Sequence, residues 1–341
     1  MLHFDSDYME GAHPKVMERL LETNLEKTVG YGQDDYCMKA AEKIRQQFGC
    51  PDALVQFLVG GTQTNDTVID ALLKKYEGVL AAESGHINCH ESGAVESSGH
   101  KILVLPSHDG KVWASDVEDF FVSFLGDGSR DHMVYPGALY ISFPTEWGTL
   151  YSLSELEELS AVCHRYCIPL FLDGARLGYG LAASDQVTMK DIARLCDVFY
   201  IGGTKVGALF GEAVVAPRPE LLPHFFTLSK QHGAILAKGR LLGLQFDALF
   251  TDNLYMDISK QAVTQALRLK EAMIARGYKP YIDSPTNQQF FVLPNADIER
   301  LAGSVTFEVW SPAGNDSSIV RFVTSWNTTA EYIDEFISLL Q

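Results

Sequence analysis

The sequence lacks the features that place a chain in a membrane or on nucleic acid. No apolar run reaches the roughly 18 residues that a membrane-spanning helix needs. Basic residues are few, since 27 Lys and Arg stand against 44 Asp and Glu and give a formal net charge of −17. Because phosphate groups and anionic lipids are bound mainly by clustered positive charge, neither nucleic acid nor a membrane surface is an expected partner.

Cysteine is also sparse and shows no ordered spacing. The six cysteines do not form the evenly spaced set of a secreted disulfide framework, and the chain begins without a basic-then-apolar leader. We therefore expect free thiols and a cytoplasmic location. The cysteines are Cys37, Cys50, Cys89, Cys163, Cys167 and Cys196.

What is present is the composition of a globular protein, with 46% hydrophobic and 21% charged residues. From residue 53 onward short apolar runs alternate with longer amphipathic ones, a pattern that predicts an α/β fold with a mainly parallel sheet. The runs are continuous rather than alternating in polarity, as in strands covered on both faces. Seven strands are expected, at residues 54–59, 79–82, 102–105, 139–143, 169–172, 198–201 and 213–216.

Helical spacing of apolar residues separates these strands, at residues 64–76, 116–125, 154–166 and 190–195. Ser154 and Glu157 form a capping-box pattern at the start of the third helix. Long helices follow Pro223 and end near Gly277. The remaining residues predict strands at 289–293, 305–310 and 319–325 and a closing helix from Thr328, which together form a small α/β domain.

Two turns after predicted strands carry candidate binding residues. The strand at 54–59 runs into Gly60-Gly61 and a helix, and a helix N-terminus approached by glycine backbone forms a site for an anion such as phosphate. His86 lies beyond the strand at 79–82, where it could stack on a planar ring or serve as a hydrogen-bonded loop residue.

Two further strand ends carry charged groups. Asp173 and Arg176 follow a wholly apolar strand, and Lys205 follows another strand 32 residues after Asp173. Because ligands of open α/β sheets gather at the carboxyl ends of strands, we expect these groups to face one crevice. A surface ion pair between Asp173 and Arg176 is the alternative. A lysine among apolar strand-end residues suits an amine nucleophile.

The order and spacing of these motifs resemble the fold-type I pyridoxal-phosphate enzymes, and specifically the family of low-specificity L-threonine aldolases and β-eliminating lyases. The resemblance covers nearly the whole chain. The matching segments are Phe4-Asp5-Ser6-Asp7, Tyr31-Gly32, Asp34-Asp35, Gly61-Thr62-Gln63, Asn65, His86, Asp173-Gly174-Ala175-Arg176, Thr204-Lys205 and Arg321-Phe322-Val323-Thr324-Ser325-Trp326.

The resemblance implies an aspartate-aminotransferase-like large domain with a seven-stranded sheet at residues 15–250 and a small domain at residues 251–341. Residues 1–14 then form an N-terminal segment that contributes to the active site. It further implies that pyridoxal 5′-phosphate is the cofactor, with Lys205 as the Schiff-base lysine. The other implied cofactor-binding residues are Asp173 at the ring nitrogen, His86 stacked on the ring, Gly61 and Thr62 at the phosphate, Arg176 beside the ring hydroxyl, and Thr204.

For the substrate, the resemblance implies that Ser6 and Arg321 grip the carboxylate of a small amino acid, with Arg176 nearby. A guanidinium fork suits that task because it matches a carboxylate with two parallel hydrogen bonds. Tyr31 resembles a substrate-binding residue contributed across a subunit interface. The family is typically a homotetramer built as a dimer of dimers, and we expect the same assembly here, with active sites at subunit interfaces.

The implied reaction is retro-aldol cleavage of a small L-β-hydroxy amino acid, such as threonine or allo-threonine, to glycine and an aldehyde, which makes the chain a lyase of amino acid metabolism. The base that takes the hydroxyl proton is expected to be His86, directly or through a water. Many family members carry a second histidine where this chain has Glu146. Glu146 serves as a base if burial raises its pKa, or it favours another substrate or reaction.

Three alternatives remain open at this point. The same cofactor supports β-elimination, transamination or racemisation. A zinc enzyme could use His86, Cys89, His90 and Glu91, although Gly85 and Gly93 argue against a helix there, and we expect no metal site. A non-catalytic scaffold could retain the fold, although Lys205, Asp173 and Arg321 together argue against it.

Overall fold

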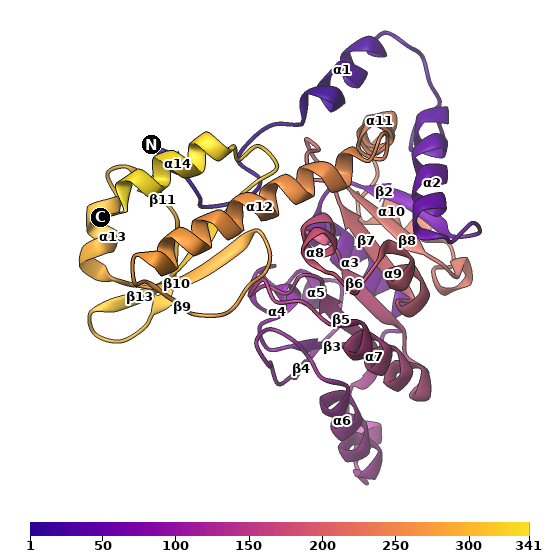
Figure 1. The fold of residues 1–341 in the computed structure, drawn as a ribbon. Coiled ribbons are helices and arrows are strands. Elements are labelled where there is room, and N and C mark those ends of the chain that lie inside the picture. The colour runs from indigo at the N-terminus through magenta and orange to yellow at the C-terminus, as the bar shows by residue number, and fades with distance from the viewer. Residues whose placement is uncertain (341) are drawn as a thin grey trace.

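In the computed structural model, which describes residues 1–340, a seven-stranded sheet forms the centre of the larger part of the molecule (Figure 1). The strand order is β2-β8-β7-β6-β5-β3-β4, and β8 alone runs antiparallel to its neighbours. The α/β prediction with a mainly parallel sheet is therefore confirmed. The strands are β2 (Leu54–Leu58), β3 (Glu77–Ala82), β4 (Ile102–Leu105), β5 (Tyr135–Ser142), β6 (Leu170–Asp173), β7 (Val198–Gly202) and β8 (Glu212–Ala216).

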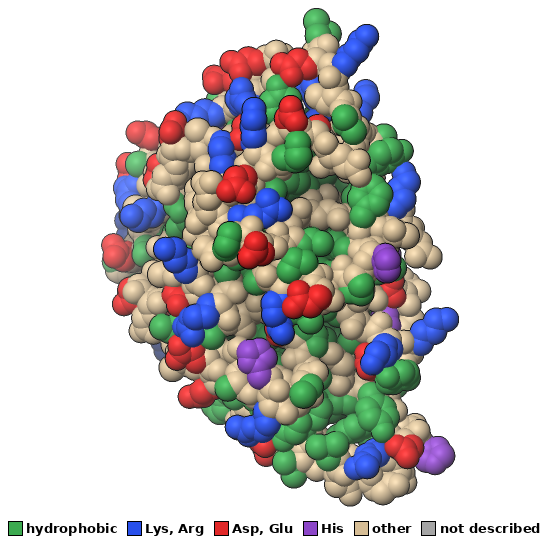
Figure 2. Space-filling model, turned by 90° about the vertical axis from the view of Figure 1, so that its right-hand side faces the viewer, with side chains coloured by type: hydrophobic (Ala, Val, Ile, Leu, Met, Phe, Trp, Pro, Cys, Tyr) green, Lys and Arg blue, Asp and Glu red, His purple; other side chains and the backbone are tan. Residues whose placement is uncertain are grey.

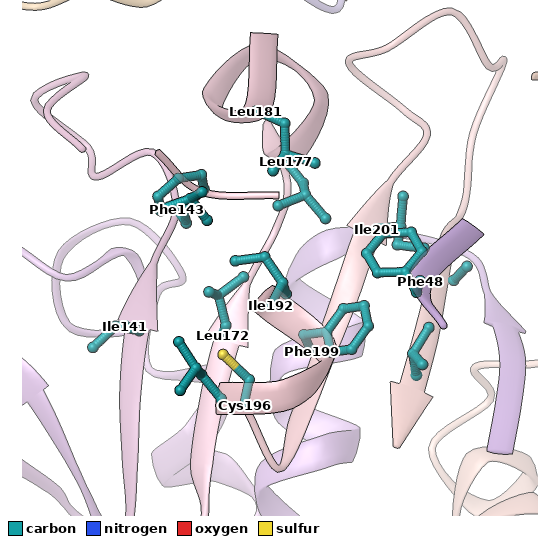
Figure 3. Packing of buried hydrophobic residues seen from close by; sticks show 14 of the residues in the cluster. Phe48, Ile141, Phe143, Leu172, Leu177, Leu181, Ile192, Cys196, Phe199 and Ile201 are labelled. Atoms are coloured by element: carbon teal, nitrogen blue, oxygen red, sulfur yellow. The ribbon is translucent and has the colours of Figure 1, made fainter. Parts of the chain in front are cut away.

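The strands are mostly apolar because both faces of the sheet are covered. Leu170 and Leu172 of β6 belong to one buried cluster, whereas Phe171 between them belongs to the cluster on the opposite face. Successive side chains of a strand point to opposite faces, so a continuous apolar run fills two layers of core. Figure 3 shows one of these layers, in which Leu172 and Phe199 pack with Phe48 from a covering helix.

Nine α-helices lie between the start of the chain and β7. They are α1 (Pro14–Glu22), α2 (Asp35–Phe48), α3 (Gly61–Leu72), α4 (His86–Cys89), α5 (Ala94–Ser97), α6 (Ala114–Gly126), α7 (Leu153–Arg165), α8 (Leu177–Ala183) and α9 (Met189–Leu195). Short 3₁₀ turns occur at Arg130–His132 and Pro219–Leu221.

The capping-box prediction for the third helix is wrong by two residues. Ser152, in extended backbone before α7, accepts a hydrogen bond from the Glu155 N–H, and the Glu155 side chain accepts one from the Ser152 N–H. Ser154 already lies inside the helix, and Glu157 faces outward to pair with Arg194. Two overlapping copies of the Ser-x-x-Glu spacing stand at this point of the sequence, and the earlier copy is the cap.

Between β8 and residue 277 the chain is helical, as the sequence predicts, with α10 (Phe225–Gln231), α11 (Arg240–Leu249) and the 22-residue α12 (Leu254–Ala275). Helix α12 extends from the large sheet to the smaller part of the molecule (Figure 1). Its Ala262 and Val263 pack in the core of the large sheet, whereas Leu269 and Met273 pack in a separate C-terminal core. A boundary between residues 250 and 251 stays a prediction.

The C-terminal part contains an antiparallel sheet in the order β12-β13-β10-β9. The single strand expected at 305–310 is wrong: β11 pairs with the N-terminal strand β1, whereas β12 pairs with β13. The N-terminal residues thus join the C-terminal part. The elements are β1 (Leu2–His3), β9 (Lys279–Pro280), β10 (Gln288–Pro294), α13 (Asn295–Leu301), β11 (Val305–Thr306), β12 (Glu308–Pro312), β13 (Ser317–Val323) and α14 (Ala330–Leu339).

No helix within residues 1–340 combines the length and the apolar character needed to cross a membrane. On the face shown in Figure 2, acidic and basic side chains are intermixed among hydrophobic ones and do not gather into a basic stripe.

Candidate active site

Lys205 and Asp173 share one cavity. Asp173 ends β6, and Lys205 lies three residues beyond β7, the parallel neighbour of β6. Both line a small cavity of about 40 Å³ together with Gly61, His86 and Glu146. An adjoining cavity of about 270 Å³ is also lined by Lys205, Arg176 and His86, and it adds Arg321 from the C-terminal sheet. The two cavities therefore join groups from both parts of the molecule.

Asp173 is held by four hydrogen-bond donors. The hydroxyls of Tyr140 and Tyr200 donate at 2.6 Å each, and the Asn65 amide and the Ala175 N–H donate at 2.9 Å each. Burial alone would raise the pKa of this carboxyl group, but the neighbouring His86 and these donors outweigh burial and lower it. Asp173 is therefore ionised around neutral pH although it is only 4% exposed.

The Lys205 amine has no hydrogen-bond or ion-pair partner within residues 1–340; its nearest aromatic contact is the Tyr8 ring, 5.9 Å from Nζ. Burial, assisted by the Arg176 cation, lowers the pKa of Lys205 to about 8. An amine with that pKa is partly neutral near physiological pH and is then a nucleophile. Nearby, burial raises the pKa of Glu212, whose carboxylate accepts hydrogen bonds from the Thr204 hydroxyl and the Gly203 N–H.

His86 is oriented by a buried carboxylate. Its Nδ1 lies 2.7 Å from Glu91 Oε1, and that same oxygen accepts a hydrogen bond from the Asn65 amide. The expectation that glycines exclude a helix here is wrong, because Gly85 immediately precedes the short helix α4. Because Glu91 is bound to the His86 ring, its role here is to orient His86. Residues 1–340 contain no cluster of His, Cys, Asp and Glu arranged to hold a metal ion.

Glu146 lies in both cavities. Its Oε1 accepts hydrogen bonds from the Ser142 hydroxyl at 2.5 Å and from the His86 N–H at 3.0 Å. Burial raises the pKa of Glu146, against the opposing effect of the Ser142 hydrogen bond. A carboxyl group with a raised pKa is able to exchange protons closer to neutral pH than an exposed one.

Arg176 forms a buried bidentate pair with Asp7 of the N-terminal segment. Its Nε donates to Asp7 Oδ2 at 2.7 Å and its Nη2 to Oδ1 at 3.0 Å, while Asn287 also donates to Asp7. The surface ion pair considered between Asp173 and Arg176 is therefore wrong. This arrangement fixes the Arg176 side chain beside Lys205 in both cavities.

Four predicted site residues lie outside these two cavities. Thr62 is exposed in the first turn of α3, and the Thr204 hydroxyl is engaged with Glu212 and the Gly211 N–H. The Ser6 hydroxyl is buried without a partner among residues 1–340. Tyr31 is 40% exposed beside a separate hollow of about 460 Å³, lined also by Met38 and Phe226, which shares no lining residue with the two cavities. Their predicted roles stay predictions.

The start of α3 fits a phosphate group. Gly60 precedes this 12-residue helix in extended backbone and offers no capping side chain. A Cβ atom built on Gly60 would meet no other atom within 4 Å, so open space surrounds the backbone there. The first-turn N–H groups and the helix dipole can therefore receive an anion from the cavity that Gly61 lines. Together with the free Lys205 amine and the ionised Asp173, the residues present fit pyridoxal phosphate.

Several site residues were missed by sequence reasoning. Tyr140 and Tyr200 lie on β5 and β7, the two strands that flank β6, and both hydroxyls reach Asp173. A tyrosine inside an apolar strand needs a hydrogen-bond partner for its hydroxyl, and that was the available signal. The sequence presents Glu91 only as a possible metal ligand and Asp7 only as part of a segment that matches the family.

Comparison with known proteins agrees with this geometry. Residues 3–289 match the beta-eliminating lyase family. A low specificity L-threonine aldolase of Pseudomonas aeruginosa is 28% identical over 342 aligned residues, which cover 97% of this chain and 95% of that protein. A solved threonine aldolase of Leishmania major is 40% identical, with a TM-score of 0.96 over 100% of this chain and 98% of that chain.

A variant of the Thermus thermophilus aspartate aminotransferase is 15% identical, with a TM-score of 0.72 over 99% of this chain and 90% of that chain. At that identity the likeness concerns the fold alone, and it confirms the predicted aminotransferase-like architecture. The match to the family and the similarity to threonine aldolases confirm the resemblance drawn from the sequence. The chain therefore belongs to the beta-eliminating lyase family, in which the threonine aldolases are its relatives.

Proposed function

We propose that this protein is a pyridoxal-phosphate-dependent lyase that cleaves small L-β-hydroxy amino acids, threonine or allo-threonine, to glycine and an aldehyde. The observation that carries the proposal is the shared cavity of an unpaired Lys205 amine and an ionised Asp173 carboxylate. The family and the threonine aldolase relatives support it.

In this proposal the cofactor is held by groups at or beyond the ends of three strands of the large sheet, β2, β6 and β7. Lys205 binds it covalently through Nζ, Asp173 faces its ring nitrogen, and the first turn of α3, with Gly61 and Thr62, receives its phosphate. The further cofactor-binding residues are His86, Arg176 and Thr204. Bound there, pyridoxal phosphate supplies an electron-poor ring that accepts the electrons released when a bond at the substrate Cα breaks.

Binding of the substrate is assigned to groups around the larger cavity. Arg321 takes the α-carboxylate, assisted by Ser6 and Arg176, and its guanidinium is held by Gln288 at 3.0 Å and by the nearby Trp310 ring. The substrate side chain then lies toward His86 and Glu146, which line the same cavity. The volume of about 270 Å³ suits a small amino acid.

Cleavage between Cα and Cβ requires removal of the β-hydroxyl proton. His86 is one candidate base, because Glu91 engages Nδ1 and leaves Nε2 to act on the substrate directly or through a water. Glu146 is the second, because Oε1 accepts two hydrogen bonds while burial raises the pKa of the carboxyl group. The carboxylate at position 146 thereby takes the place that a histidine holds in many family members.

We further propose that the chain assembles as a cytoplasmic homotetramer with active sites at subunit interfaces. Tyr31, assigned to the substrate site of a neighbouring subunit, is exposed beside the hollow lined by Met38 and Phe226, which are themselves 55% and 41% exposed. Exposed apolar side chains around a hollow are typical of a surface that another protein covers.

The test incubates purified protein and the cofactor with L-threonine, L-allo-threonine and L-cysteine, and then assays glycine, aldehyde, keto acid and sulfide. The proposal predicts glycine and an aldehyde from a β-hydroxy amino acid and no product from a Lys205→Ala variant. Sulfide and keto acid from L-cysteine without glycine from either threonine isomer would assign β-elimination instead.

A further inference from the structure

The guanidinium of Arg321 already holds a carboxylate of the chain itself. Glu308 on β12 lies directly opposite Arg321 on β13, and its Oε2 accepts a hydrogen bond from Arg321 Nη2. Both residues line the cavity of about 270 Å³ that includes Lys205. The Glu308 carboxylate is therefore already bound to the Arg321 guanidinium, the group that we assign to the substrate carboxylate.

The positions of the Arg321 N–H groups restrict where a second carboxylate can bind. Nη1 donates to Gln288 at 3.0 Å, Nη2 also reaches the Asp5 carbonyl at 3.5 Å, and Nε is buried with no acceptor among residues 1–340. A carboxylate bound through two parallel bonds needs two adjacent donors. With Nε buried, those donors are Nη1 and Nη2, so an incoming carboxylate competes with Glu308 for Nη2.

Exposure indicates which of the two partners moves. The Glu308 side chain is 45% exposed and can turn toward solvent, whereas the Arg321 side chain is 12% exposed. The Trp310 ring further fixes Arg321, with the guanidinium carbon 5.1 Å from the ring centroid. An exchange at this site therefore moves the glutamate and leaves the arginine in place.

We propose that Glu308 sets the affinity of the site for amino acids: it occupies the carboxylate position of Arg321 in the empty site and turns outward when a substrate carboxylate replaces it. This inference rests on the proposed function for the assignment of the substrate carboxylate to Arg321. A ligand without a carboxylate cannot make the exchange. A ligand with a second carboxylate meets the displaced Glu308, so the substrate class is small monocarboxylic amino acids.

The test measures binding of glycine to the holoprotein by titration calorimetry, for the parent chain and for Glu308→Gln and Glu308→Ala. Both variants are expected to bind glycine roughly two- to fivefold more tightly, the factor that corresponds to an exposed ion pair no longer opposing the ligand. Glycinamide, which lacks the carboxylate, is expected to gain nothing. Glu157→Gln is the matched control, because Glu157 is 47% exposed and pairs with Arg194 away from the cavity.

Unchanged or weaker glycine binding in both variants would overturn the proposal, because Glu308 would then be idle or would orient Arg321. An equal gain for glycinamide would overturn it as well, since the effect would not concern the carboxylate. Failure of the proposed function has a separate signature: the parent chain binds glycine but cleaves neither threonine isomer, and the glycine titrations still decide the role of Glu308.

Discussion

The two sides of the candidate site are built differently. On the side of the large sheet, Asp173 is 4% exposed and receives hydrogen bonds from four donors, so its charge and position are fixed. On the side of the C-terminal sheet, Arg321 is held by a half-exposed Glu308 that a ligand can replace. We call the Asp173 side the chemical side, where the contacts are fixed, and the Arg321 side the recognition side, where a ligand can replace the internal contact.

This difference follows from where each group lies in the fold. Asp173 sits between two flanking strands, and a buried charge is tolerated only when its neighbours supply hydrogen bonds. Glu308 lies on β12, which pairs with β13 on one side only. Its ion pair with Arg321 is partly solvated, and such a pair contributes little to the stability of the fold. Changes on the two sides should therefore have different kinetic and thermodynamic signatures.

The largest effect is expected from Asp173→Asn on the chemical side. Asparagine keeps the size of the side chain but not the charge that the lowered pKa of Asp173 maintains. We expect kcat to fall by about 100- to 1,000-fold, as when a preorganised electrostatic contact is removed. Steady-state kinetics on a β-hydroxy amino acid measure this. A variant within about threefold of the parent kcat would contradict a role for the carboxylate charge.

Glu146→Gln tests the acid–base group that lies between the two sides. Because burial raises the pKa of Glu146, its ionised form is lost as the pH falls through that raised value, and a base in this position then stops working. We expect about 100-fold lower kcat and disappearance of the acidic limb of the pH profile. An unchanged limb in the variant would assign the limb, and the base, to His86.

On the recognition side, Arg321→Lys is expected to raise KM by about tenfold with a smaller effect on kcat. Lysine keeps the charge but cannot offer two adjacent donors to a carboxylate. Arg194→Lys serves as the control, since Arg194 pairs with exposed Glu157 elsewhere. A loss confined to kcat would remove Arg321 from substrate binding and place it in the chemical step.

The smallest expected effects are on the free energy of unfolding, and they should differ between the two sides of the site. Tyr200→Phe removes a buried hydrogen bond to Asp173 and should lower the free energy of unfolding by about 1–3 kcal/mol. Glu308→Gln removes a half-exposed charge and should lower it by less than about 1 kcal/mol. Urea unfolding of both variants provides the comparison. Equal losses would mean that the recognition side is as rigid as the chemical side.

The fold and the central pair of site residues could be predicted because they depend on sequence-local signals. Continuous apolar runs predicted the strands, and Asp173 and Lys205 lie at the end of one of them and shortly beyond the end of the next. The partners of Asp173 depend on which strands are neighbours and in what register, and the sequence alone does not state either. The position of Glu308 opposite Arg321 arises because the expected strand at 305–310 divides, with β11 pairing to β1 and β12 to β13.

The measurement that tests the central claim most directly is the visible absorption spectrum of the purified protein with pyridoxal phosphate, compared with Lys205→Ala. The account predicts a yellow protein whose visible band survives dialysis, disappears in Lys205→Ala and persists in Lys111→Ala, a lysine paired with Glu155 outside the site. A parent chain that stays colourless, or a Lys205→Ala variant that keeps the band after dialysis, would contradict covalent attachment of the cofactor to Lys205.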